Sequence, residues 1–265
     1  MMHNIVQEWK TAYTSTIECL PRPVYFRAYS IEESTYIEEH QHVWWQFLFS
    51  RQGLIHIQVN DTYISLPSQY GVWIPPKCPH KVWAKEKINL ESLYIDSSYI
   101  NNLENTTKVV IVNNFVREFI HHACTTIPVD YDENGTDGRK IKVLIEDLIT
   151  LPDAQFNLPF PHNPAFFKLC LQIQKNPCVM IPLKQAADYL LLSERTFSRL
   201  FLKYTGIPYT KWCLKARLLY SLELLVLGKS VTEIAFDLGY SSPSAFIHAF
   251  KSLFNTTPNQ FIKTE

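Results

Sequence analysis

The sequence predicts an α+β protein of two domains: an N-terminal antiparallel β-barrel followed by helices, and a C-terminal all-α domain with two helix-turn-helix units joined by a long helix. Three observations lead to this prediction. Residues 24–96 form short aromatic and β-branched runs, prolines crowd residues 152–164, and the remainder of the chain contains one helical pattern twice. We therefore place the domains at residues 1–150 and 166–265, with a linker at 151–165.

The β-barrel is predicted from runs such as VYFRAYS, WWQFLFS, LIHIQVN and GVWIPP, which are bounded by Asn-Asp, Gly and Pro. Such runs are typical of antiparallel strands joined by tight turns. Three helices are expected after the barrel, at Tyr99–Glu104, Asn114–Ala123 and Asp137–Thr150, where apolar residues recur at helical spacing. The prolines of LPDAQFNLPFPHNP predict a semi-rigid linker.

One helix-turn-helix unit is predicted at Gly228–Phe261 from the residues that begin and end its helices. Ser230 and Glu233 form a capping box at the start of the first helix. Gly239 suits the left-handed residue that ends this helix, because glycine enters that conformation without steric cost. Ser242 then caps a second helix, and a proline in its first turn supports the same start.

A copy of this unit lies about fifty residues upstream, at Ile181–Pro208. The segment SERTFSRLF aligns with SPSAFIHAF, and in both segments two phenylalanines four residues apart mark the buried side. One long helix is expected between the copies, at Pro208–Leu227, with a length of roughly 30 Å. Successive major-groove faces of DNA lie about 34 Å apart, so this helix could place two recognition helices in adjacent grooves.

The charges are unevenly distributed, although the chain as a whole is neutral. Residues 166–265 carry twelve Lys or Arg and six Asp or Glu, a net charge of +6, whereas the residues before them carry −6. The positive charge therefore lies on the segment with the helix-turn-helix units, where the neutralisation of DNA phosphates requires it.

The C-terminal segment resembles the DNA-binding domain of the AraC/XylS family of bacterial transcription regulators. The resemblance covers about Ala165–Ile262 and is carried mainly by SVTEIAFDLGYSSPSAFIHAFKSLFNTTP. It implies that the second helix of each unit enters the major groove of promoter DNA. The residues that it assigns to DNA binding are Ser193, Arg195, Thr196, Ser198, Arg199, Lys203, Ser242, Ser244, Ile247, His248 and Lys251. The family usually has arginine at the position of His248.

The segment Glu38–His80 resembles a cupin, the small β-barrel that many AraC-type regulators carry as a sensor. Its first pattern, H-x-H-x3-Q, begins at His40, and its second, P-x-K-x2-H, ends at His80. Two histidines at i and i+2 of a strand point to the same face, which in a barrel is the interior. Metal-binding cupins have Gly at the position of Lys77, and they often have Asn at the position of Ala84.

Three interpretations of this cupin site stay open. In the first, His40, His42 and His80 hold a divalent transition metal, which would be the only cofactor. In the second, an organic effector occupies a pocket formed by His40, His42, Gln46, Trp73 and His80. In the third, the histidines satisfy buried hydrogen bonds. Gln46 stands where metal-binding cupins have Glu, and the lost negative charge favours the organic effector.

Two classes of function follow from these resemblances. The first is a sequence-specific DNA-binding transcription regulator whose activity is controlled by a ligand in the barrel. The second is a metal-dependent cupin enzyme of the dioxygenase or isomerase type, fused to an auxiliary helical module. The missing Glu disfavours the second class, and the sequence has no nucleophile–base or paired-carboxylate arrangement and no phosphate-binding loop. We therefore expect a regulator that is not an enzyme and has no catalytic residues.

The expected partners are double-stranded promoter DNA, a small-molecule or metal effector, a second copy of the chain, and RNA polymerase if the protein is an activator. The resemblance implies that the helices after the cupin pair two subunits; the alternative is that they pack on the barrel of their own chain. No apolar run is long enough to span a bilayer, so no membrane partner is expected. The six cysteines form no C-x-x-C pair and predict reduced thiols, and hence a cytoplasmic protein.

Overall fold

The computed structural model describes residues 10–12, 17–60, 62–100, 103–154, 158–161 and 163–264. The chain divides into two compact units. The first contains Met1–Asn60 and Ser65–Ala154, and the second contains Asp61–Ile64 and Gln155–Glu265. The first is built on β-strands and the second on helices, so the predicted two-domain α+β class is confirmed.

The β-strands form two sheets, and nearly all of the pairing is antiparallel. One sheet has the order β1-β3-β8-β5-β6-β11 and the other the order β10-β7-β4-β9-β2. The two-residue strand β1 is the exception, because it pairs with β3 in parallel. The bounds are β1 Lys10–Thr11, β2 Val24–Ile31, β3 Thr35–His40, β4 Trp45–Ser50, β5 Ile55–Val59, β6 Thr62–Leu66, β7 Tyr70–Ile74, β8 His80–Ala84, β9 Ile88–Ile95, β10 Lys108–Ile111 and β11 Leu158–Pro159.

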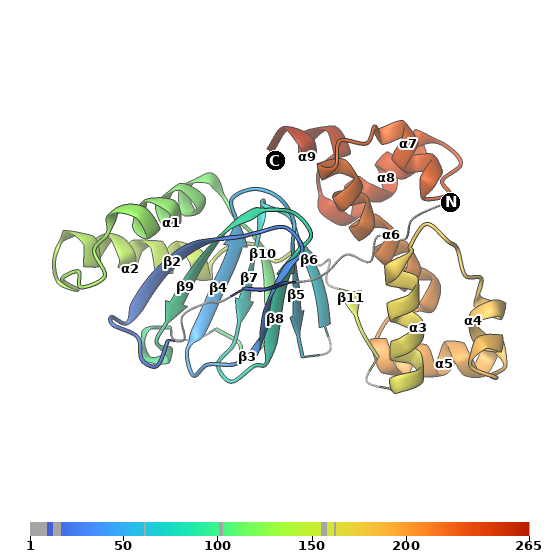
Figure 1. Ribbon diagram of the computed structural model, residues 1–265, viewed down its shortest axis with the longest axis horizontal. Coiled ribbons are helices and arrows are strands. Elements are labelled where there is room, and N and C mark those ends of the chain that lie inside the picture. Colours follow the sequence, from blue (N-terminus) through green and yellow to red (C-terminus); the bar gives the residue numbers. More distant parts are fainter. Residues whose placement is uncertain are drawn as a thin grey trace. The chain divides into compact units, whose positions relative to one another are not determined.

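The central strand β4 is buried along its whole length. Trp45, Phe47 and Phe49 of β4 belong to a core that includes residues of the helices α1 (Asn114–Thr126) and α2 (Thr136–Ile149). Figure 1 shows this helical hairpin beside the sheet that contains β2, β4 and β9. Because side chains alternate along a strand, the intervening residues of β4 lie on the opposite face, and they are buried too.

Gly71 of β7 makes this packing of aromatic side chains possible. A Cβ atom at Gly71 would collide with the ring of Phe47, which lies on the neighbouring strand β4. The ring of Phe47 in turn packs against Trp73 at a centroid distance of 5.1 Å. The absence of a side chain at residue 71 therefore gives Phe47 its place in the core.

The helices after the sheets differ in part from the prediction. The helices expected at Asn114–Ala123 and Asp137–Thr150 are confirmed as α1 and α2, each extended or shifted by one to three residues. The helix expected at Tyr99–Glu104 is wrong for the described residues of that segment; residues 101–102 lie outside the described part. The described part of this segment has only the 3-10 turn Ser97–Tyr99, whose N-terminus is capped by the carboxylate of Asp96.

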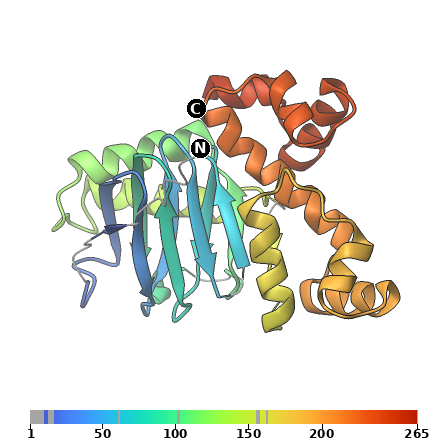
Figure 2. The same ribbon diagram turned by 45° about the vertical axis from the view of Figure 1, so that its right-hand side comes forward.

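The second unit contains seven helices in its described part. They are α3 Pro164–Lys175, α4 Leu183–Tyr189, α5 Glu194–Thr205, α6 Tyr209–Val226, α7 Val231–Asp237, α8 Pro243–Phe254 and α9 Pro258–Thr264. Figures 1 and 2 show α6 running between the pair α4–α5 and the pair α7–α8. At 18 residues α6 is about 27 Å long, close to the length expected from the sequence.

The capping residues act as the sequence predicts. At α7 the hydroxyl of Ser230 accepts a hydrogen bond from the Glu233 amide at 3.2 Å, and the Glu233 carboxylate accepts one from the Ser230 amide at 3.0 Å. Gly206, Gly228 and Gly239 have φ angles of 73°, 79° and 76°, the left-handed conformation that ends a helix. Local chemistry thus fixes the ends of the helices that carry the two helix-turn-helix units.

Candidate nucleic-acid interface and histidine cluster

The first recognition helix is α5. Ser193 caps it by accepting a hydrogen bond from the Thr196 amide at 3.2 Å. Phe197 and Phe201 are fully buried and stack on one another at 5.7 Å, which fixes the inner side of the helix. The other predicted DNA-binding residues of this unit lie away from that core: Arg195, Arg199 and Lys203 are exposed, and Thr196 and Ser198 are half-buried.

Arg195 and Arg199 are the best candidates for base contacts. They are four residues apart, so they lie on one side of α5. Within the described part of the chain, neither guanidinium has a hydrogen bond or ion pair to another residue. Both side chains are therefore available to an external acceptor such as a guanine base or a phosphate.

The second recognition helix is α8, and its surface is different. Ser242 caps it by accepting from the Ala245 amide at 3.2 Å, and Phe246 and Phe250 are fully buried. The remaining predicted residues of this unit are the exposed Ser244, His248 and Lys251 and the half-buried Ile247. This surface has no arginine, so α8 cannot grip a guanine in the way that α5 can.

The hydroxyls of Ser193 and Ser242 are already used within the protein. Each accepts the capping hydrogen bond of its helix, and the Ser193 hydroxyl also donates to the Thr196 hydroxyl at 2.9 Å. Their predicted place at the start of a recognition helix is confirmed, whereas their contact with DNA stays a prediction.

In the first unit, the structure brings together the three predicted cupin-site histidines. His40 ends β3, His80 begins β8, and the two residues are paired across the strands. The ring centroids are 4.2 Å apart for His40 and His80, 5.1 Å for His42 and His80, and 6.2 Å for His40 and His42. We call these three residues the histidine cluster. His40 is exposed, His42 half-buried and His80 fully buried, so the cluster extends from the surface inward.

Each ring is oriented by a backbone carbonyl. Nδ1 lies 2.8 Å from the Glu38 oxygen in His40, 2.8 Å from the Trp44 oxygen in His42, and 2.9 Å from the Cys78 oxygen in His80. A carbonyl only accepts, so Nδ1 carries the proton in each ring and, in the neutral form, Nε2 holds a lone pair.

Nε2 of His80 differs from the other ring nitrogens of the cluster because it is buried without a partner in the described part of the chain. Its side chain is 1% exposed, and its buried Nε2 has no hydrogen-bond partner among the described residues. Burial, together with the nearby His40, lowers the pKa of His80 to about 3. The ring is therefore neutral near pH 7, with a buried and unused acceptor.

Gln46 completes a polar network beside the cluster. Its amide Oε1 lies 3.0 Å from Nε2 of His42, and its Nε2 lies 3.3 Å from the Ser92 hydroxyl. Burial lowers the pKa of His42, so this ring is neutral near pH 7 and its Nε2 accepts. Two acceptors cannot hydrogen-bond to each other, so the amide group of Gln46 is turned the other way round. Its NH2 group donates to His42, and its carbonyl oxygen accepts from the Ser92 hydroxyl.

Two residues of this site, Ser92 and Tyr94, do not figure in the sequence prediction. Tyr94, two residues beyond Ser92 along β9, packs edge-on against His42 at 5.8 Å. Trp44 stacks on His42 at 5.5 Å. Ser92 and Tyr94 share a face of β9, which lies next to β4. The alternating pattern of β9 is the only signal in the sequence that could have indicated them.

Trp73 is a correction to the predicted effector pocket. It pairs with Phe47 across the strands and packs edge-on against Trp45 at 6.1 Å, in the core that α1 and α2 complete. Gln46 points to the opposite face of the sheet, because it alternates with Trp45 and Phe47 along β4. Trp73 therefore belongs to the core and not to the site of Gln46.

The residues that the structure describes include neither a ready metal site nor a membrane-spanning helix. Among them, no group of three or more His, Cys, Asp or Glu side chains has an arrangement that could hold a metal ion. The three histidine rings are therefore close together without forming a metal site as they stand. No helix among the same residues is long and apolar enough to cross a membrane.

Comparison with known proteins matches both parts of this chain. A helix-turn-helix domain family matches residues 186–264. The HTH-type transcriptional regulator NimR of Escherichia coli K12 is 30% identical over 223 residues, which cover 84% of this chain and 81% of NimR. The regulatory protein PocR of Salmonella typhimurium is 32% identical over 104 residues, which cover 39% of this chain and 34% of PocR. Among solved structures, ToxT of Vibrio cholerae O395 aligns over 92% of this chain and 99% of its own, with 13% identity and a TM-score of 0.39.

Proposed function

The chain belongs to the AraC/XylS family of transcription regulators, and we propose that it binds promoter DNA through α5 and α8 under the control of an effector held at the histidine cluster. The observation that carries the DNA-binding part is the pair of exposed arginines on α5, on the side opposite the buried Phe197 and Phe201. A guanidinium can donate two parallel hydrogen bonds to guanine, a contact worth about 1–3 kcal/mol of discrimination.

The two recognition helices have unequal tasks in this proposal. α5 reads sequence through Arg195 and Arg199. On α8, the ring of His248 can donate one hydrogen bond to a base, and Ile247 can contact a thymine methyl group. Lys203 and Lys251 are exposed in the last turns of α5 and α8, where they are suited to phosphates. Specificity then comes mainly from α5, and affinity from both helices.

For the effector, we favour an organic molecule with a hydrogen-bond donor. The neutral His80 presents a buried lone pair at Nε2 that no described residue uses. A ligand hydroxyl or amide N–H would satisfy it, and the rings of Trp44 and Tyr94 beside His42 would contact the rest of the ligand. Gln46 supports this assignment, because a neutral amide gives the site no negative charge for a cation.

A divalent transition metal is the second candidate effector. The observation in its favour is the carbonyl contact of each Nδ1, since metal-bound histidines almost always donate from their other ring nitrogen. His40, His42 and His80 would be its ligands. Against it, Nε2 of His42 is already engaged by Gln46.

We propose that the protein acts as a homodimer joined through α1 and α2, and that it contacts RNA polymerase if it is an activator. Phe115 of α1 and Val143 of α2 are 52% and 51% exposed, so the hairpin keeps apolar side chains at its surface. A regulator, rather than a metal-dependent enzyme, fits the membership of the family and the absence of a carboxylate at residue 46.

Selection of random DNA duplexes on the purified full-length protein tests the proposal. The expected result is one enriched sequence motif with two half-sites about one helical turn apart. Repetition with an extract of small cell metabolites should change the yield of that motif if an organic effector controls binding. Enrichment of no motif, with or without the extract, would contradict sequence-specific binding.

A further inference from the structure

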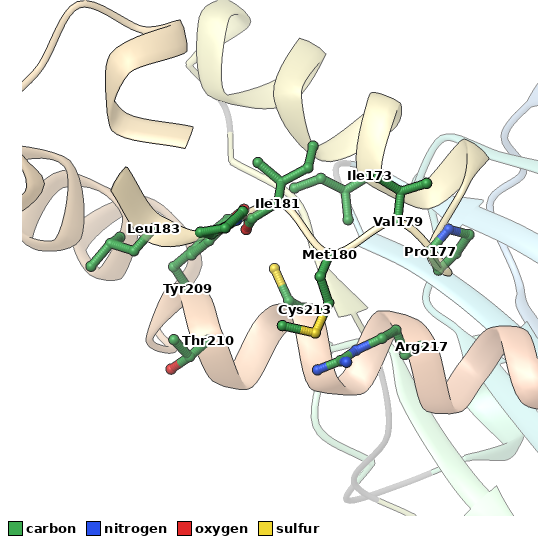
Figure 3. Close-up of a pocket in the computed structure, with 11 residues that line it drawn as sticks. Ile173, Pro177, Val179, Met180, Ile181, Leu183, Tyr209, Thr210, Cys213 and Arg217 are labelled. Atoms are coloured by element: carbon green, nitrogen blue, oxygen red, sulfur yellow. Dashed lines mark hydrogen bonds between the residues drawn. The ribbon is translucent and has the colours of Figure 1, made fainter. Parts of the chain in front are cut away.

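The second unit contains a cavity of about 120 Å³ that the DNA-binding function does not use. It lies between α6 and residues 176–182, the segment that leads into α4. Figure 3 shows the side chains of Met180 and Cys213 between the segment and the helix, with Arg217 one turn further along α6. Val179 and Met180 are 55% and 61% exposed, so the cavity is open to solvent at their side.

The walls of the cavity are apolar, and Arg217 is the only charged residue among those that line it. One guanidinium nitrogen, Nη1, donates to the Leu238 carbonyl oxygen at 3.3 Å. The Nε–H is buried and has no acceptor among the described residues. The other terminal nitrogen, Nη2, has no hydrogen bond to any described residue, so the guanidinium brings an unused donor and a fixed positive charge to the lining of the cavity.

The cavity also adjoins both helix-turn-helix units. Ile181 and Leu183 of its lining lead into and begin α4 of the first unit. On the other side, Arg217 bonds the turn of the second unit at Leu238, and the sulfur of Met180 lies 3.9 Å from where a Cβ atom at Gly239 would be. An occupant would therefore contact segments that set the position of α4 and of the turn between α7 and α8.

We propose that this cavity binds a small aliphatic carboxylate, with its carboxylate on the guanidinium of Arg217 and its apolar end between Ile173, Met180 and Cys213, and that binding changes the affinity for DNA. The volume sets the size, because a cavity of about 150 Å³ holds benzene, so a branched chain of four or five carbons fits here. The charge sets the class: guanidinium pairs with carboxylate through two parallel hydrogen bonds. This would be a second regulatory site, separate from the histidine cluster.

Met180 provides a direct probe of occupancy. The only other methionines are Met1 and Met2, so a carbon-13 methyl label on methionine gives a single internal signal in the full-length protein. Titration with sodium isovalerate should shift the Met180 signal saturably, and the neutral isovaleramide should bind at least about tenfold more weakly. Equal binding of the two compounds, or no shift with isovalerate, would overturn the proposal.

Two variants and a control locate the site. Arg217→Gln should reduce the affinity for isovalerate to that for the amide, and Cys213→Leu should block both compounds by filling the cavity. Lys184→Gln removes one positive charge from an exposed position on α4 and should leave the titration unchanged. Circular dichroism checks that each variant is folded. If both folded variants gave the same titration curve as the wild type, isovalerate would bind elsewhere and the proposed site would be refuted.

The effect on DNA is measured separately, by fluorescence anisotropy of a selected duplex. Saturating isovalerate should change the dissociation constant at least about threefold, in the wild type but not in Cys213→Leu. An unchanged constant in the wild type would refute the regulatory role even where the Met180 shift is seen. Failure at this site leaves the proposed role of α5 and α8 intact, because the affinity without isovalerate is measured in the same titration.

Discussion

Leu191 and Gly239 occupy equivalent positions in the turns of the two helix-turn-helix units, and both are left-handed, with φ angles of 56° and 76°. Each residue follows the C-cap of the first helix of its unit, Leu190 after α4 and Leu238 after α7. The side chain of Leu191 is 93% exposed and gains almost nothing from packing. The first turn therefore holds a leucine in a conformation that favours glycine.

Leu191→Gly should stabilise the helical unit by about 0.5–1 kcal/mol, because the left-handed cost of about 1–2 kcal/mol exceeds the extra entropy of glycine in the unfolded chain. Gly239→Ala is the reverse change and should destabilise the unit by about 1 kcal/mol, because alanine carries the left-handed cost that glycine avoids. No clash adds to this cost, since the new Cβ would meet the Met180 sulfur at an ordinary contact distance of 3.9 Å. Urea unfolding followed by helical circular dichroism measures both. A destabilised Leu191→Gly would mean that the exposed leucine has a role in the fold that its contacts do not reveal.

Lys251→Gln should weaken binding to all DNA sequences and lower the slope of log affinity against log salt by about one, because one phosphate contact is lost. Anisotropy titrations at several salt concentrations give this slope. Lys142→Gln, an equal charge change at an exposed position in the first unit, is the control and should leave the slope unchanged. If Lys251→Gln altered base preference at constant slope, its assignment to a phosphate would be wrong.

The stability of the first unit should fall as the pH falls below about 6.5. The pKa of buried His80 drops from 6.5 to about 3 on folding, so between these values the unfolded chain binds a proton that the folded chain does not. Each such histidine lowers the free energy of unfolding by up to about 1.4 kcal/mol for each unit by which the pH falls. His56, whose pKa burial also lowers to about 3, adds to the effect.

The test is the pH dependence of unfolding of the first unit in His80→Gln. The variant should take up about one proton fewer on unfolding at pH 4–6 than the wild type, which flattens the curve. His122→Gln, at an exposed position on α1, should leave the curve unchanged. Identical curves for His80→Gln and the wild type would show that His80 is not held neutral in the folded protein.

The helical half of the protein was predictable because its signals are local. A capping box, two serine caps and three glycines fixed the ends of its helices, and each acts within a few residues of chain. Lys77, which stands where metal-binding cupins have Gly, has a φ angle of 58°, a value that favours glycine, and its amide donates to the His42 carbonyl at 2.6 Å. Local steric and capping rules carry such information in the sequence.

The site in the first unit was only partly predictable, because it depends on strand order. β4 is buried on both faces, so alternation alone could not tell whether Trp73 of the neighbouring strand faces the helices or the histidines. Ser92 and Tyr94 reach the site because β9 pairs with β4, a contact between residues more than forty positions apart. The helix expected at Tyr99–Glu104 is a separate error, because the described part of that segment forms only the 3-10 turn Ser97–Tyr99.

The metal interpretation makes its own prediction about the histidine cluster. If His40, His42 and His80 hold a divalent transition metal, the protein prepared without chelator should copurify with it and lose affinity for it below about pH 6, where imidazoles become protonated. The double change of His40 and His42 to Ala should then remove the metal, while DNA binding by α5 and α8 stays intact. Negligible metal by elemental analysis would exclude this occupant and support the organic effector.

The central claim is that α5 provides most of the sequence discrimination, and one comparison tests it most directly. Fluorescence anisotropy on the selected duplex and on a scrambled duplex should be measured for Arg199→Ala and His248→Ala in the full-length protein. Arg199→Ala should lose about 1–3 kcal/mol on the selected duplex only, so that discrimination disappears, whereas His248→Ala should weaken binding modestly and keep the preference. A larger loss of discrimination in His248→Ala than in Arg199→Ala would contradict the account.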